Sequence, residues 1–210
     1  MDNSSRRAFT LIELLVSIAI IALITGISMA GFSKFTATAQ NTRCIEFVHQ
    51  TKTALEQIYQ RDSVWPRLLI DGAGAGDGKL DARIGVSLAR SGVMSLTYKA
   101  IKRDDGSVAY TLSGRDKFGV VTPWALDYIA NHADSATMSS KLPGGGTIDD
   151  HILRYSVDLD DDGLTEVAHG HDGVKATVRA QACVWSYGRD GKPNTKDDVR
   201  SWTKGQEVIW

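Results

Sequence analysis

The sequence Arg6-Arg7-Ala8-Phe9-Thr10-Leu11-Ile12-Glu13 runs directly into an uncharged, mainly apolar stretch from Leu14 to Ser33. A helix rises about 1.5 Å per residue, so about twenty residues span roughly 30 Å, the hydrocarbon thickness of a bilayer. Glu13 therefore lies at the mouth of a helix of membrane length, where an ionised group is costly and needs a partner. The pattern predicts a membrane helix whose one carboxylate has a function.

A basic leader, a small residue, Phe-Thr-Leu-Ile-Glu and a long apolar helix together resemble the type IV prepilins and the pseudopilins of type II secretion. The resemblance implies that a prepilin peptidase cuts between Ala8 and Phe9 on the cytoplasmic side and methylates Phe9. It also implies that Glu13 neutralises the terminal amine of a neighbouring subunit during filament assembly. The chain departs from the family at Ala8, where the family usually has Gly.

Three other interpretations of this stretch remain open. A core helix would be too long for a domain of this size, and a plain transmembrane anchor would not require Glu13. A secretory signal is the third, because Ser28-Met29-Ala30 resembles a small-x-small cleavage site, although its apolar region would exceed the usual length. The prepilin interpretation accounts for both the length and the carboxylate.

The charge pattern predicts topology and excludes some partners. Arg6 and Arg7 precede the apolar helix, so the positive-inside tendency predicts a cytoplasmic amino terminus. Everything from about Lys34 onward would then lie outside the inner membrane. The formal net charge of −1 argues against strong attraction to nucleic acid or anionic lipid. Two cysteines, Cys44 and Cys183, are too few for a disulfide scaffold, and whether they pair is left open.

We expect four segments along the chain. Residues 1–8 form the prepilin leader, 9–33 the transmembrane helix, 34–62 its amphipathic continuation and 63–210 a periplasmic head. The continuation is predicted because proline is absent until Pro66 and because apolar residues recur with mostly helical spacing. These residues are Phe35, Ala39, Ile45, Val48, Leu55 and Ile58.

The head is predicted to be small and α+β, with an antiparallel sheet and the long helix packed on it like a stalk. Asp71–Gly78 is expected to form a glycine-rich mobile loop, and Asp81–Ser91 a short helix. Strands gather late in the sequence, which favours this class. They are expected at Val108–Leu112, Ile152–Leu159, Val174–Ser186 and Glu207–Trp210. Asp116-Lys117-Phe118-Gly119 resembles the Asp-x-aromatic-Gly turn that precedes the sheet in secretion pseudopilins.

One acidic loop lies near the carboxy terminus. It resembles the loop with which the major pseudopilin of type II secretion binds calcium, through a Ser-x-Gly-x-Asp segment and a later Asp. Calcium takes six to eight oxygen ligands. The resemblance implies ligands from Ser186, the Tyr187 carbonyl, Asp190 and either Asp197 or Asp198. The alternative is that Asp and Gly simply make good turns here.

A second acidic loop, Asp158-Leu159-Asp160-Asp161-Asp162-Gly163, has the alternating aspartates and glycine that begin a calcium loop. Asp158, Asp160 and Asp162 are the candidate ligands. His169 stands at the twelfth position, where an EF-hand requires Glu, so Glu166 is the candidate substitute. A polar turn between strands is the alternative interpretation.

The remaining polar residues indicate no catalytic site. His169-Gly170-His171 lacks a visible third ligand for zinc, and no nucleophile–base spacing stands out, so we expect no enzyme activity. Trp185, Trp202 and Trp210 are expected to pack in the core and at the terminus.

Taken together, these features predict the structural subunit of a periplasmic pseudopilus, similar to the major pseudopilin and acting in protein export across the outer membrane. The resemblance implies self-assembly, prepilin peptidase, other pseudopilins, inner-membrane platform proteins and the bacterial inner membrane as partners, with calcium as cofactor and no nucleic acid. The alternatives are a type IV pilin of a surface or DNA-uptake filament and a tethered or secreted calcium-dependent binding module.

Overall fold

The structure is a computed structural model that describes residues 10–74 and 76–208, without the side chains of residues 27–34. It divides into two compact units, Met1–Gln40 and Asn41–Trp210. The helix α1 (Leu11–Asp62) begins in the first unit and continues without a break into the second. The predicted long helix, from the apolar stretch to residue 62, is therefore confirmed. Among the residues that the structure describes fully, no helix is both long and apolar enough to span a membrane.

Within the second unit, α1 contributes a narrow buried stripe. Cys44, Val48, Thr51, Leu55 and Ile58 are each at most 2% exposed. Their spacing of four and three residues alternates, as expected for one face of a helix. Two residues of the predicted apolar stripe are exposed: Ile45, in the second unit, is 41% exposed, and Phe35, which belongs to the first unit, is 73% exposed. Cys44 and Thr51, which are small or polar, take the buried positions instead.

The stripe packs against a four-stranded antiparallel sheet. Its order is β1 (Gly78–Lys79), β4 (Arg154–Val157), β7 (Ala182–Ser186) and β8 (Val199–Arg200). Residues of β4 and β7 belong to the same core cluster as the α1 stripe. The α+β class with a helix on antiparallel strands is thus confirmed. Cys44 and Cys183 are both buried and unpaired, and burial raises the pKa of each thiol to about 12.

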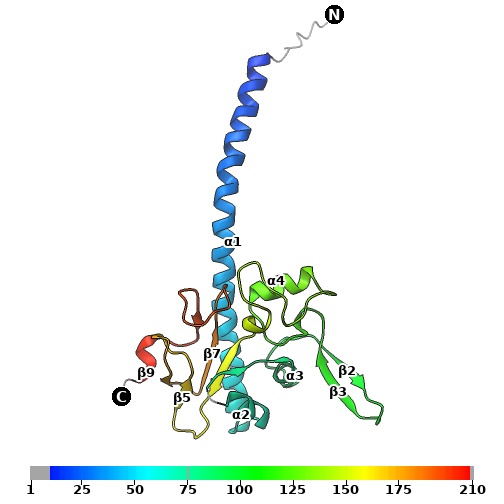
Figure 1. The fold of residues 1–210 in the computed structure, drawn as a ribbon, viewed down its shortest axis with the longest axis vertical. Helices are drawn as coiled ribbons and strands as arrows, with labels where there is room; N and C mark the ends of the chain where they lie inside the picture. The colour runs from blue at the N-terminus through cyan, green and yellow to red at the C-terminus, as the bar shows by residue number, and fades with distance from the viewer. Residues whose placement is uncertain (1–9, 75, 209–210) are drawn as a thin grey trace, which may run out of the picture. The chain divides into compact units, whose positions relative to one another are not determined.

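Two smaller sheets complete the second unit (Figure 1). One consists of β5 (Leu164–Val167), β6 (Ala176–Arg179) and β9 (Glu207–Val208), and the other is the hairpin of β2 (Tyr98–Lys102) and β3 (Val108–Leu112). Helix α2 (Arg67–Ala73) precedes the first strand, and helices α3 (Ala82–Arg90) and α4 (Pro123–Asn131) and three short 3-10 turns lie between strands. These turns are Gly114–Asp116, Asp149–His151 and Lys204–Gln206.

Several expected elements differ from those observed. The strand predicted over Val174–Ser186 is two strands, β6 and β7, in different sheets. The loop predicted over Asp71–Gly78 is wrong at both ends, because α2 continues to Ala73 and β1 begins at Gly78. The helix predicted at Asp81–Ser91 is confirmed as α3, and the Asp81 carboxylate caps it by accepting the N–H groups of Arg83 and Ile84.

The Asp116–Gly119 turn connects the hairpin to the main sheet. Asp116 is buried and accepts the Thr97 N–H at 2.8 Å. Gly119 pairs with Asp81 in an isolated bridge, and its φ of 122° lies in the region that favours glycine. A Cβ at this position would collide with the Leu80 carbonyl oxygen.

Gly119→Ala should therefore destabilise the second unit by about 3 kcal/mol, since strained φ and overpacking each cost roughly 1–3 kcal/mol. At this size the melting temperature should fall by about 10 °C. Gly92→Ala is the matched control, because its φ of 75° is also positive but no atom lies within 4 Å of the added Cβ. The control should lose only about 1 kcal/mol. Equal melting temperatures for the two variants would contradict this account.

Candidate functional site

The amino end of α1 is held by a reciprocal capping box. Glu13 Oε2 accepts the N–H and the hydroxyl of Thr10, both at 2.9 Å, and the Glu13 N–H donates to Thr10 Oγ1 at 3.3 Å. This arrangement satisfies donors that the first turn of a helix leaves unpaired. The Thr-x-x-Glu spacing was visible in the sequence, and its capping role was missed. Ala8 and Phe9, the predicted processing residues, lie outside the described residues.

The first turns of α1 present an apolar surface all round. Every large apolar side chain from Leu11 to Ile24 is exposed, between 49% for Val16 and 83% for Leu11. Glu13 is the sole carboxylate on this part of the described helix. A contiguous exposed apolar surface of this kind indicates contact with lipid or with other protein.

The second acidic loop, between β4 and β5, is organised by its first aspartate. Asp158 is 3% exposed, and its two oxygens accept the N–H groups of Asp161 at 2.8 Å and Gly163 at 2.7 Å. Asp161 and Gly163 have φ values of 60° and 80°, which let the backbone wrap around that carboxylate. Asp161 also accepts the hydroxyl of Tyr59 on α1. Hydrogen bonds therefore hold this loop as a closed turn.

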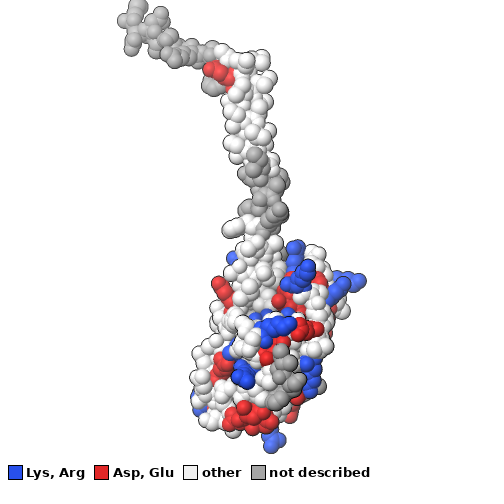
Figure 2. Space-filling model, turned by 90° about the vertical axis from the view of Figure 1, so that its left-hand side faces the viewer, with Lys and Arg blue, Asp and Glu red and all other residues white. Residues whose placement is uncertain are grey.

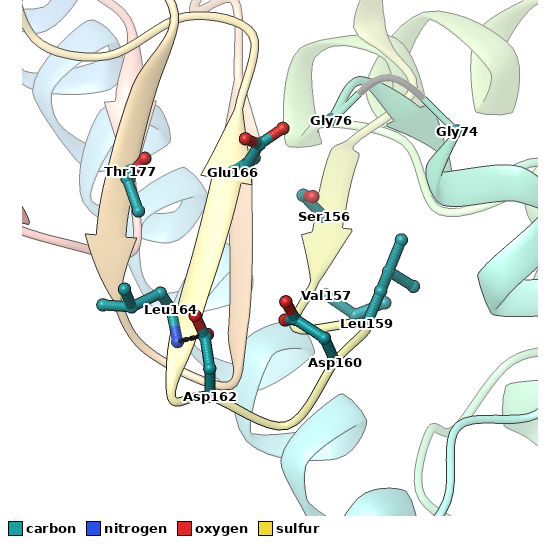
Figure 3. A pocket seen from close by; sticks show the side chains of 10 residues that line it. All are labelled: Gly74, Gly76, Ser156, Val157, Leu159, Asp160, Asp162, Leu164, Glu166 and Thr177. Atoms are coloured by element: carbon teal, nitrogen blue, oxygen red, sulfur yellow. Dashed lines mark hydrogen bonds between the residues drawn. The ribbon is translucent and has the colours of Figure 1, made fainter.

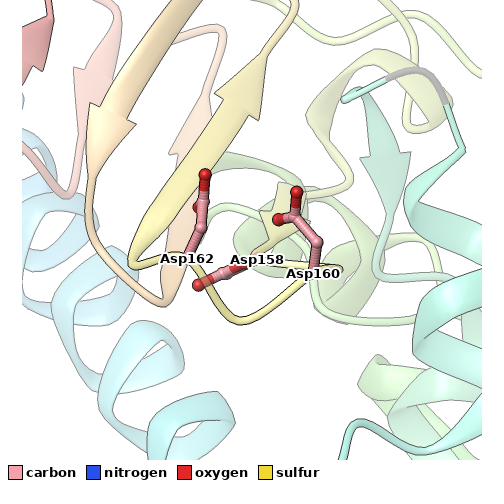
Figure 4. A group of neighbouring side chains, drawn as sticks. All are labelled: Asp158, Asp160 and Asp162. Carbon is pink, nitrogen blue, oxygen red and sulfur yellow. The ribbon is translucent and has the colours of Figure 1, made fainter.

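The wrapped backbone brings Asp158, Asp160 and Asp162 together (Figure 4). One ligand atom from each lies within 4.8 Å of the others. Oxygens bound to one calcium at about 2.3–2.6 Å are at most about 5 Å apart, so this spacing fits such an ion. The negative charge of Asp162 is the main reason why the pKa of Asp160 is raised. A cation would relieve this repulsion.

A cavity of about 440 Å³ opens beside the Asp158, Asp160 and Asp162 cluster (Figure 3). Asp160, Asp162 and Glu166 line it, together with Ser156, which is 3% exposed. The Glu166 carboxylate instead pairs with Lys175 at 2.6 Å, and it is not part of the cluster. Sequence reasoning missed Ser156, because only the pleat of β4 brings it to the same cavity.

The carboxy-terminal acidic loop is arranged differently. The Thr195 hydroxyl lies 2.7 Å from Asp197 Oδ1, 3.0 Å from Asp198 Oδ1 and 3.3 Å from Asp190 Oδ1. The other Asp197 oxygen accepts the N–H groups of Arg189 and Asp190, at 2.6 Å and 3.2 Å. The three predicted carboxylates are therefore brought together, but around a hydroxyl that sequence reasoning did not single out.

The two neighbouring aspartates of this loop differ in electrostatics. Burial acts to raise the pKa of Asp197, but hydrogen bonds from Thr195 and two backbone N–H groups outweigh it, so the pKa is lowered. Asp198 pairs with Arg200 at 3.0 Å, yet burial dominates and its pKa is raised. A residue already paired with a guanidinium is a poor calcium ligand unless that pair breaks.

The other predicted ligands of the carboxy-terminal loop are Ser186 and the Tyr187 carbonyl. Ser186 Oγ accepts the Gly188 N–H at 3.1 Å. The Tyr187 hydroxyl donates to Asp77 at 3.3 Å, which leaves the prediction for the carbonyl untested. Among the residues described, Asp158, Asp160 and Asp162 form the one group with metal-ligand spacing. Calcium in the carboxy-terminal loop stays a prediction.

His171, Trp185 and Trp202 have packing roles. His171 lies 2.7 Å from a Glu207 oxygen that also accepts the Trp202 indole N–H at 2.9 Å. Trp185 and Trp202 are buried and meet edge to face at 5.8 Å, as expected for core packing. Trp210 lies outside the described residues.

Comparison of the sequence with known proteins finds one family model and several similar proteins. Residues 3–29 match a family model described as the prokaryotic N-terminal methylation motif. The type IV major pilin protein PilE of Neisseria gonorrhoeae is 26% identical over 111 residues, 53% of this chain and 59% of that protein. The fimbrial protein EcpC of Eikenella corrodens is 31% identical over 119 residues, 54% of this chain and 76% of EcpC. The type IV major fimbrial protein FimA of Dichelobacter nodosus is 26% identical over 130 residues, 60% of this chain and 83% of FimA.

The likeness to the gonococcal pilins covers only part of them. The chain spans 59%, 30% and 55% of the lengths of three of these proteins. No solved structure gives a significant match. The comparisons therefore rest on sequence.

Proposed function

This chain belongs to the type IV pilin-like family, and from that premise we propose that it is the structural subunit of a filament. The family is structural and not enzymatic, which agrees with the expectation from the sequence. In the proposal, residues 9–33 anchor the chain in the inner membrane before assembly, with the second unit outside that membrane. The helices of successive copies then pack side by side, and Glu13 of one copy meets the terminal amine of another.

The observation that carries the proposal is the exposed apolar surface from Leu11 to Ile24 with Glu13 at its start. A soluble domain would bury these side chains, since exposing them costs about 25 cal/mol per Å². Lipid before assembly and neighbouring helices after it supply the apolar surroundings. A carboxylate in those surroundings needs a counter-charge, and a free amine on a cleaved terminus provides one.

Mass spectrometry of the mature amino terminus tests the proposal. We expect a chain that starts at Phe9 and carries one methyl group on its terminal nitrogen, made by a prepilin peptidase. A chain starting at Gly31 would instead identify a secretory signal, and an uncut chain would identify a plain anchor. Either of these two masses would refute the filament proposal.

A surface filament is the form of the proposal that the relatives favour, because the similar proteins are named type IV major pilins and fimbrial proteins. The sequence had favoured a pseudopilus of type II secretion, with type IV pilin as the alternative. The pseudopilus is the second candidate. Its support is the carboxy-terminal loop, in which Asp190 and Asp197 converge on Thr195.

We also propose that the Asp158, Asp160 and Asp162 cluster binds calcium. The supporting observations are the mutual spacing of the three carboxylates and the backbone turn held by Asp158. An ion here would stiffen the β4–β5 turn, which is already joined to α1 because Asp161 accepts the Tyr59 hydroxyl. Glu166 would complete the set of ligands, with its carboxylate leaving Lys175 and binding the ion. The bound ion would stabilise the second unit.

A further inference from the structure

The β2–β3 hairpin is the least covered part of the second unit. Its two strands pair only with each other among the strands that the structure describes. Every residue from Thr97 to Val108 is exposed. Helix α3 covers one face of the hairpin's base, where Leu112 is buried and Arg90 lies over the Tyr110 ring. The rest of the ribbon gains stability from a covering partner, because a two-stranded hairpin by itself is marginally stable in water.

The exposed hairpin is apolar along its strands and has a net charge of +1, from Lys99, Lys102 and Arg103 against Asp104 and Asp105 at its tip. Tyr98, Ile101, Val108 and Tyr110 are 39–55% exposed, which is a high density of large apolar side chains for such a short segment. Lys99 and Arg103 are exposed on the same face of β2 as Ile101, whereas the exposed Lys102 lies on the other face. Apolar side chains interleaved with positive charge fit a partner surface that combines apolar and acidic groups.

The chain itself carries such a surface at the β4–β5 turn. Leu159 is 55% exposed, and Asp160, Asp161, Asp162 and Glu166 are exposed around it. Figure 2 views the molecule from the side that is on the left in Figure 1, and it shows carboxylates gathered at the lower edge. With Asp158 the turn itself has four carboxylates, so a divalent cation leaves it negative, while Glu166 on β5 pairs with Lys175. Calcium binding and docking of a cationic partner are therefore compatible.

The two surfaces lie on opposite sides of the second unit, the hairpin to the right and the β4–β5 turn to the left in Figure 1. They are different surfaces and cannot meet within one copy. A contact between two different surfaces of identical chains is heterologous, and repeated without closure it builds an open helical filament.

We propose that the β2–β3 hairpin of one copy docks on the β4–β5 turn of the next copy in the filament. Lys99 and Arg103 face the carboxylates of Asp160 and Asp162, while Ile101, which lies between them on the same face of β2, covers Leu159. This inference rests on the proposed filament function and adds to it the contact between neighbouring second units.

A charge swap in the full-length chain, in cells that assemble it, tests the contact. Lys99→Glu with Arg103→Glu should reduce filament yield at least tenfold, and so should Asp160→Lys with Asp162→Lys. Combining all four substitutions should restore filaments, because opposite charges again face each other. Lys141→Glu with Arg83→Glu makes the same change in net charge on other exposed residues and should leave filaments intact. Failure of the four-fold variant to recover, or an equal loss in the control, would overturn the contact.

The swap also separates docking from calcium binding, because the variant with two lysines in the turn cannot hold the ion. If adding the hairpin substitutions to that variant restores filaments, the recovery must come from the contact between copies.

A cysteine pair gives an independent measurement. Arg103→Cys with Asp160→Cys should give disulfide-linked ladders in mildly oxidised filaments, with little background because Cys44 and Cys183 are 0% exposed. Wild-type chains that form no filaments would refute the proposed function, whereas filaments without ladders would refute the hairpin contact alone.

Discussion

Glu13→Leu is expected to abolish filament assembly while leaving membrane insertion and cleavage intact. Leu is more favourable in hydrocarbon than Glu, so the anchor itself should be retained or strengthened. An unpaired charge in the membrane costs on the order of 3 kcal/mol on insertion scales. Removing the carboxylate leaves the neighbour's amine without its partner, and about 3 kcal/mol shifts an assembly equilibrium roughly a hundredfold. Electron microscopy of filaments and fractionation of the membrane measure the two outcomes separately.

The capping box supplies matched controls for this prediction. Glu13→Gln keeps a side chain that can accept the Thr10 N–H, but it lacks the charge. Thr10→Val removes the capping hydroxyl and keeps the charge, at a cost of about 1 kcal/mol in helix stability. We expect no filaments from Glu13→Gln and near-normal filaments from Thr10→Val. The reverse pattern would show that Glu13 acts only as a helix cap.

Calcium is expected to raise the melting temperature of the full chain in detergent, and a chelator to lower it. At a hundred times the dissociation constant, ligand binding stabilises by about 2.7 kcal/mol, which corresponds to roughly 5–10 °C at this size. Asp160→Asn with Asp162→Asn should eliminate the shift. Without calcium this double variant should melt at or above the wild-type temperature, because it removes the repulsion that raises the pKa of Asp160.

Asp190→Asn separates the two acidic loops. If the ion binds the β4–β5 turn, this variant should keep the full calcium shift, with only a small loss of basal stability from the weakened hydrogen bond to Thr195. Loss of the shift in Asp190→Asn alone would move the site to the carboxy-terminal loop. A wild-type chain that melts at the same temperature with calcium and with chelator would refute a stabilising ion at either place.

The long helix was predictable because helical continuity is a local property. Absence of proline before Pro66 and a mostly helical recurrence of apolar residues were enough to place its end near residue 62. Which side of that helix is buried was less predictable. Thr51 is buried at 0% exposure and Ile45 is 41% exposed, because the neighbouring sheet, and not residue hydrophobicity alone, selects the buried face.

The short strands were harder to predict. β1, β8 and β9 have two residues each, too few for an alternating pattern, and they exist because neighbouring strands offer hydrogen bonds. The stretch from Val174 to Ser186 reads as one strand because both parts are rich in β-forming residues. Only pairing with different partners separates β6 from β7.

The sequence by itself determined the apolar helix, the charge at its mouth, the α+β class and the existence of two acidic loops, because composition and periodicity are properties of neighbouring residues. Only the tertiary structure decided how the carboxylates of each loop are used. In the β4–β5 turn, Asp158 accepts the backbone N–H groups and leaves Asp160 and Asp162 facing a cavity. In the carboxy-terminal loop, Thr195, Arg200 and backbone N–H groups occupy the oxygens. Whether carboxylates meet at one point depends on backbone dihedral angles and on partners distant in the chain. The spacing of residues in the sequence does not specify either.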